Sequence, residues 1–173
     1  MDRKKLIIDT DCGSDDAVAI AMVLNDPNFE VIMCTTVSGN VNCKQAAINT
    51  LTTIEHAGTY EPPVYMGAID MLLRDMQYAA ETHGEDGMGD IGLVPHRLKI
   101  GEGNGVIRML EALKAAGKVV ATASSKPEPF VKRILEHFSI DRYFDEIAGS
   151  TMDEKHAGKA EVVADVLRRL HIP

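Results

Sequence analysis

The stretch LIIDTDCGSDDA, residues 6–17, decides the fold prediction for this chain. Its three leading apolar residues predict a buried parallel strand, and Gly13 permits a tight turn after that strand. Four carboxylates stand within eight positions: Asp9, Asp11, Asp15 and Asp16. Ligands of open α/β sheets bind at the carboxyl ends of the strands, so we expect these acids to border a ligand site.

The density of these carboxylates predicts a metal site. Clustered carboxylates repel one another and need a compensating cation, and hard oxygen ligands suit Ca²⁺ or Mg²⁺. Acids at a helix start also act as caps that the helix dipole favours. One or two acids would fill that role, whereas four after an apolar strand favour a divalent-metal site.

The composition limits the kind of protein. The chain has 173 residues, 45% of them hydrophobic, and a net charge of −8. An acidic chain without a basic cluster argues against nucleic acid as a partner. Its apolar runs are too short to span a bilayer, and the amino terminus does not resemble a signal peptide. Three sparse cysteines, Cys12, Cys34 and Cys43, suggest reduced thiols in a cytoplasmic protein.

Strands alternate with helices along the whole chain. We expect strands at residues 6–8, 30–37, 62–66, 118–123 and 144–148. We expect helices at residues 16–24, 42–56, 71–80, 106–116, 127–138 and 157–170. Glycine-rich residues 81–105 predict a long loop, either functional or simply connecting. The pattern predicts an α/β fold, a three-layer α/β/α sandwich with a mostly parallel Rossmann-like sheet, in a single domain over residues 1–173.

Three motifs in chain order resemble the inosine–uridine type of nucleoside hydrolase. The family's hallmark, D-x-D-P-G-x-D-D-A after a strand, stands here at residues 9–17, with Cys12 where the family usually has Pro. Residues 35–41 (TTVSGNV) are similar to the second motif of the family, and residues 83–89 (HGEDGMG) to its H-G-x-D-G-x-G loop. The resemblance covers residues 1 to about 112.

The resemblance implies a bound Ca²⁺ that lowers the pKa of a water molecule. That water attacks the anomeric carbon of a ribonucleoside and releases the free base. By position, Asp11 would be metal ligand and general base, and Asp16 a metal ligand. Asp15 and Asn40 would hold the ribose hydroxyls, and His83 would lie near the substrate. A carboxylate can accept the proton of the attacking water.

The sequence from about residue 113 to 173 resembles another family, the phosphoglycolate-phosphatase branch of the haloacid dehalogenase superfamily. The segment VVATASSKPEPFVKRILEHFSIDRYFDEIAGS, residues 119–150, carries this resemblance. Ser124 matches the hydroxyl residue that binds phosphate, and Lys159 matches the lysine that stabilises the phosphoaspartyl intermediate. Without the resemblance, Ser124 is as well explained as a helix cap and Lys159 as a solvated residue. The chain thus resembles a mosaic of two incomplete hydrolases.

Three functions follow from these resemblances. The first is a divalent-metal-dependent nucleoside hydrolase with Ca²⁺. The second is a phosphatase acting on a small phosphomonoester with Mg²⁺, in which Asp9 is the nucleophile and Asp11 the acid/base; it expects Asp9 and Ser124 on adjacent strands. The third is a catalytically silent α/β module that binds a metal or an anion. A small-molecule substrate is the expected partner, and an open sheet edge favours a homo-oligomer.

Overall fold

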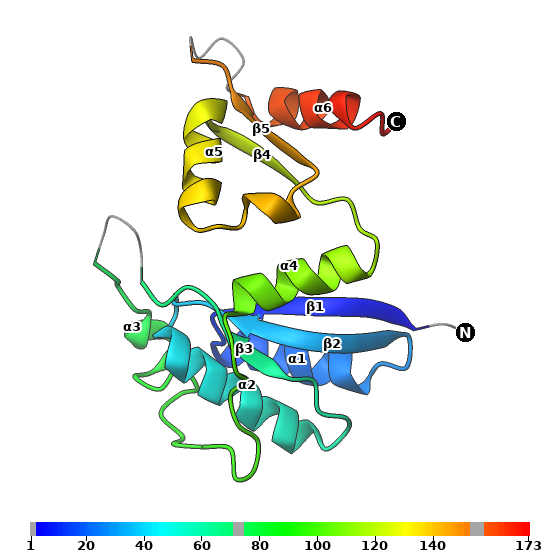
Figure 1. The fold of residues 1–173 in the computed structure, drawn as a ribbon. Helices are drawn as coiled ribbons and strands as arrows, with labels where there is room; N and C mark the ends of the chain where they lie inside the picture. The colour runs from blue at the N-terminus through cyan, green and yellow to red at the C-terminus, as the bar shows by residue number, and fades with distance from the viewer. Residues whose placement is uncertain (1–2, 71–74, 153–157) are drawn as a thin grey trace. The chain divides into compact units, whose positions relative to one another are not determined.

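The computed structural model describes residues 3–70, 75–152 and 158–173 (Figure 1). The chain divides into two compact units, Met1–Met109 and Leu110–Pro173. The described strands form two sheets, one in each unit. The α/β class with parallel strands is therefore confirmed, but the single sheet expected from the alternating pattern is wrong.

The sheet of the first unit consists of β1 (Lys4–Thr10), β2 (Phe29–Thr36) and β3 (Val64–Met66), in that order. Both strand pairs are parallel. Asp9 lies opposite Thr35 in the ladder of β1 and β2. The segments that follow these strands therefore leave the sheet at the same edge.

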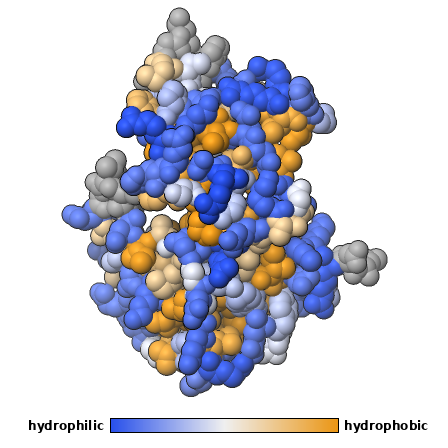
Figure 2. All heavy atoms as spheres, viewed as in Figure 1, coloured by the Kyte–Doolittle hydropathy of each residue, from blue (hydrophilic) through white to orange (hydrophobic). Residues whose placement is uncertain are grey.

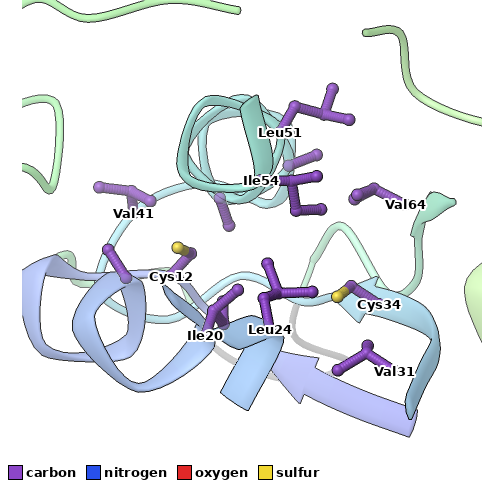
Figure 3. Packing of buried hydrophobic residues seen from close by; sticks show 12 residues of the cluster. Cys12, Ile20, Leu24, Val31, Cys34, Val41, Leu51, Ile54 and Val64 are labelled. Atoms are coloured by element: carbon purple, nitrogen blue, oxygen red, sulfur yellow. The ribbon is translucent and has the colours of Figure 1, made fainter. Parts of the chain in front are cut away.

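Two helices cover one face of this sheet, α1 (Ser14–Asn25) and α2 (Cys43–Ala57). They enclose an apolar core with β2 and β3 (Figure 3). Its largest fully buried side chains are aliphatic: Ile20, Ile54, Val31 and Val64. This core fixes where the turn between β1 and α1 meets the start of α2.

The ends of α2 follow the expected capping chemistry. Asn42 is the N-cap, and its Oδ1 accepts a hydrogen bond of 2.9 Å from the amide of Gln45. Gly58 ends the helix in the left-handed region, with φ at 64°. The sequence predicts this helix over nearly the same residues, because Asn42 and Gly58 are typical cap residues.

The other face of the sheet meets the start of α4 (Gly105–Ala115). Val106 and Met109 line a cavity of about 80 Å³ together with Asp9 and Thr35. Strand residues alternate between faces, so Asp9 and Thr35 lie on the face opposite to the core of α1 and α2. The first residues of α4 thus lie on the face of the sheet opposite to α1 and α2.

The second unit is built on a parallel pair, β4 (Ala121–Pro127) and β5 (Glu146–Ser150). Helices α5 (Glu128–His137) and α6 (Lys159–Arg169) and the short 3-10 helix η1 (Asp141–Tyr143) complete it. Ala148 of β5 and Val162 and Val166 of α6 form its small core. Strand β4 begins three residues later than predicted and continues through Pro127, which caps α5.

One predicted helix differs from the structure. Residues 71–74 of the expected helix 71–80 lie outside the described residues, residues 75–79 are not helical, and α3 spans only Ala80–His83. On α5, Val131 and Leu135 are buried, whereas Phe138, which follows the helix, is 48% exposed.

The described surface is mixed in character. Figure 2 shows apolar side chains distributed among hydrophilic ones on the visible face. Exposed large apolar side chains occur in both units, among them Val18, Met22 and Phe138. Among the described residues, no helix has both the length and the hydrophobicity needed to cross a membrane.

Candidate functional site

The first carboxylate of the motif is tied to the neighbouring strand. Asp9 and Thr35 are partners in the parallel ladder, and the Thr35 hydroxyl donates a hydrogen bond of 2.6 Å to Asp9 Oδ1. Thr35 is buried, whereas Asp9 remains largely exposed. Asp9 is thus fixed on the sheet face opposite to the core of α1 and α2.

The second carboxylate reaches across to the motif that follows β2. Asp11 Oδ2 accepts a hydrogen bond of 2.7 Å from the amide of Asn40. Gly39 makes this approach possible, because a Cβ atom at Gly39 would lie 2.2 Å from the same oxygen. The first two family-like motifs therefore meet at the carboxyl ends of β1 and β2, as predicted from the parallel sheet.

The remaining two acids occupy the first turn of α1. Asp16 Oδ2 accepts a hydrogen bond of 3.1 Å from the amide of Gly13, so this carboxylate caps its own helix. The side chain of Asp15 is 79% exposed. The capping role considered for these acids is therefore real for Asp16.

The glycine-rich segment brings His83 to the same place. His83 Nδ1 lies 3.0 Å from the Ser14 hydroxyl and 3.9 Å from Asp15 Oδ1. The His83 side chain is only 15% exposed. A Cβ atom at Gly13 would lie 2.8 Å from Asn40 Nδ2 and 3.1 Å from His83 Nδ1. The turn, the segment after β2 and the His83 segment thus converge around Gly13.

Cys12 stands where the resembled family usually has proline, and the turn uses groups that proline lacks. Its backbone φ is 21°, outside the range that a proline ring allows. Its amide donates a hydrogen bond of 2.9 Å to the Thr10 hydroxyl. Burial raises the pKa of the Cys12 thiol to about 11, and the negative charges of Asp16 and Asp11 add to that rise. This thiol is therefore not a nucleophile near neutral pH.

The chemistry of these donors suits a hard cation, but the described set is small. Among residues 3–70, 75–152 and 158–173, no three His, Cys, Asp or Glu side chains are grouped to hold a metal ion. The hydrogen bonds given above use one oxygen each of Asp11 and Asp16. A cation at this turn would therefore need water, backbone oxygen or other ligands in addition.

Ser124 and Lys159 belong to the second unit. The Ser124 hydroxyl accepts a hydrogen bond of 3.1 Å from the amide of Lys126, and Lys159 is the exposed first residue of α6. The expectation that Asp9 and Ser124 stand on adjacent strands is wrong. Strand β1 pairs with β2, whereas β4 pairs with β5 in a separate sheet. Alternation of strands and helices along the chain does not determine which strands share a sheet.

Two residues of this region were not identified from the sequence. The Asn49 side chain in the middle of α2 is buried and donates hydrogen bonds to the carbonyl oxygens of Cys12 and Asp86. The Asp86 carboxylate accepts hydrogen bonds from the amides of Met88, Asp90 and Gly92. Asn49 stands among residues that the helical pattern buries, together with Thr50 and Thr53, and an amide at such a position needs hydrogen-bond partners, which was the available signal.

Comparison with known proteins assigns the family. The family described as inosine-uridine preferring nucleoside hydrolase matches residues 6–133. The chain belongs to this family. The probable uridine nucleosidase 2 of Arabidopsis thaliana is 40% identical over 125 residues, which are 70% of this chain and 39% of that protein.

Solved structures extend this result to the fold. The purine-preferring ribonucleoside hydrolase from Gardnerella vaginalis has 27% sequence identity and a TM-score of 0.63, over 84% of this chain and 48% of that one. A predicted phosphatase from Clostridium acetobutylicum has 41% identity over 39% of this chain and 32% of that one, at a TM-score of 0.39. The chain thus spans less than half the length of the Arabidopsis thaliana nucleosidase and of the Gardnerella vaginalis hydrolase.

Proposed function

We propose that the first unit carries a ribonucleoside hydrolase site at the turn between β1 and α1. The observation that carries this proposal is the convergence of three separate motifs on Gly13. Asp11 contacts the Asn40 amide, and His83 contacts Ser14. A nucleoside is the expected small-molecule substrate, in keeping with the family.

Within this site, each proposed role follows from the position of the side chain. Asp11 is the general base, because a carboxylate can take the proton of an attacking water. Asp15, exposed at the start of α1, and Asn40, beside Gly13, are available to accept and donate hydrogen bonds to a ribose diol. His83 lies beside Asp15 and borders the substrate.

Ca²⁺ is the proposed cofactor, with Mg²⁺ as the alternative. Asp11 and Asp16 are its proposed ligands, since Asp11 lies in the turn after β1 and Asp16 in the first turn of the helix α1 that follows it. When bound, the cation would lower the pKa of a water molecule and so supply the nucleophile. Ligands from outside these two residues would complete its coordination.

The phosphatase alternative has no geometric support from the strand pairing. It needs Asp9 and Ser124 on neighbouring strands, but their strands belong to different sheets. We retain as a proposal only that residues beyond about 113 descend from a phosphatase of the haloacid dehalogenase superfamily. The boundary between the compact units, after Met109, lies close to that position.

The proposed activity is tested by measuring ribose released from inosine and uridine, with Ca²⁺ and with Mg²⁺. We expect release by the wild type and a loss of about a hundredfold or more in Asp11→Asn, which keeps the shape but not the base. Glu30→Gln makes the same chemical change at the opposite end of β2 and should retain activity. No release with either cation, alongside a rise in melting temperature on adding Ca²⁺, would instead support a silent metal-binding module.

A further inference from the structure

The amide of Asn49 connects two segments of the proposed site. Its Nδ2 donates a hydrogen bond of 3.0 Å to the carbonyl of Cys12 and one of 2.8 Å to the carbonyl of Asp86. Its Oδ1 accepts a hydrogen bond of 2.9 Å from Gln45 Nε2. Asn49 is 1% exposed, and both N–H groups of its side chain donate to backbone oxygens of different segments.

We propose that Asn49 is a positioning residue that holds residues 79–92 against the acidic turn. Asn49 contacts neither carboxylate of the proposed metal site through these bonds. It acts through the backbone, by fixing the Cys12 carbonyl between Asp11 and Gly13 and the Asp86 carbonyl three residues after His83.

The acidic turn needs such support because its backbone is strained. Cys12 has a φ of 21°, an uncommon value for a residue with a side chain. Helix α2 holds this residue through Asn49, whose side-chain amide donates a hydrogen bond to the Cys12 carbonyl. The rigid helix therefore fixes the direction of the chain between Asp11 and Gly13.

The opposite side of the bridge is shaped to accept the Asn49 amide. Gly87 has a φ of 75°, and a Cβ atom there would lie 2.7 Å from Val41 Cγ1 and 3.1 Å from Asn49 Nδ2. Only glycine allows the segment to come this close without strain. The segment is also held at Ala79, whose amide donates a hydrogen bond of 2.9 Å to the carbonyl of Asn40.

Loss of the Asn49 bridge should release the His83 segment while α2 stays folded. Each buried hydrogen bond contributes modestly to stability, but an unpaired buried carbonyl is costly, so the segment should open more often. His83 would then leave Ser14 and Asp15. The inference rests on the proposed function only for its catalytic consequence, because the opening itself is measured without substrate.

The experiment is hydrogen–deuterium exchange on the variant Asn49→Leu, because the leucine side chain has a similar volume and no N–H groups. We expect exchange in residues 79–92 to accelerate about tenfold or more, in keeping with the loss of two hydrogen bonds. Thr53→Val is the matched control, since it removes a buried hydrogen bond of 2.9 Å to the Asn49 carbonyl within the same helix. Gly87→Ala disturbs the bridge from the other side and leaves α2 unchanged, so it serves if Asn49→Leu does not fold.

The results separate the inference from the proposed function. Equal exchange of residues 79–92 in Asn49→Leu and Thr53→Val would overturn the positioning role; if Asn49→Leu does not fold, unchanged exchange in Gly87→Ala would overturn it. If the wild type releases ribose, Asn49→Leu should also lower kcat more than it changes KM, because it displaces catalytic groups rather than removing a binding contact. If the wild type releases none, the proposed activity fails while accelerated exchange still supports the bridge.

Discussion

The amide of Asn40 donates a hydrogen bond of 2.7 Å to Asp11 Oδ2, across 29 residues of sequence. This bond joins the segments that follow two neighbouring parallel strands, and it orients the carboxylate that we propose as metal ligand and general base. The amide is part of the backbone and carries no mobile charge. This hydrogen bond therefore holds the Asp11 carboxylate in place without a basic side chain that would neutralise its negative charge.

Gly39→Ala should disrupt this orientation. The added methyl would lie 2.2 Å from Asp11 Oδ2, so the carboxylate or the backbone must move. We expect weaker Ca²⁺ binding by calorimetry and a loss of about 1–3 kcal/mol of unfolding free energy, the usual cost of overpacking.

The control for Gly39→Ala is Gly158→Ala. It adds the same methyl where the nearest heavy atom is 3.5 Å away, and its φ of −65° suits alanine. Ca²⁺ affinity should be unchanged in this variant. Equal effects of the two substitutions would show that Gly39 does not position Asp11.

Local chemistry made much of the first unit predictable from the sequence. Asn42 and Gly58 mark the ends of α2, because cap residues have specific backbone and hydrogen-bonding roles. The apolar run before Asp9 and the β-branched run before Ser38 identified β1 and β2. Parallel strands end at one edge, which predicted that Asp11 and Asn40 would lie close together.

Long-range pairing and backbone bonds were not predictable in the same way. Nothing local in the residues around Ser124 shows that β4 pairs with β5 apart from the first sheet. The side chain of Asn49 donates hydrogen bonds to the backbone carbonyls of Cys12 and Asp86. Every residue has a backbone carbonyl, so the sequence does not indicate which ones Asn49 binds. Such bonds depend on the chain path, which a motif does not specify.

Glu55 should make stability depend on acid pH. The pKa of Glu55 is about 2, below its ordinary 4.5, mainly because its carboxylate accepts hydrogen bonds from the amides of Leu98 and His96. The amide of Arg97 donates a further hydrogen bond to the same carboxylate. Protonation therefore favours the unfolded chain. The stabilisation is complete above about pH 4.5 and is lost as the pH falls toward 2. The difference in melting temperature between wild type and Glu55→Gln should shrink across this window, whereas a constant difference would contradict the prediction.

Arg169 should stabilise the second unit through a network of three carboxylates. Its guanidinium lies 2.9 Å from Glu128, 3.0 Å from Glu146 and 2.7 Å from Asp165, which joins α5, β5 and α6. Exposed pairs contribute little singly, so we expect Arg169→Met to cost about 1–2 kcal/mol of unfolding free energy in urea. Arg168, 75% exposed and bonded to Asp165, provides the control Arg168→Met, with an expected cost below about 0.5 kcal/mol. High salt should reduce the cost for Arg169→Met, and equal costs for both variants would show that the network does not stabilise the unit.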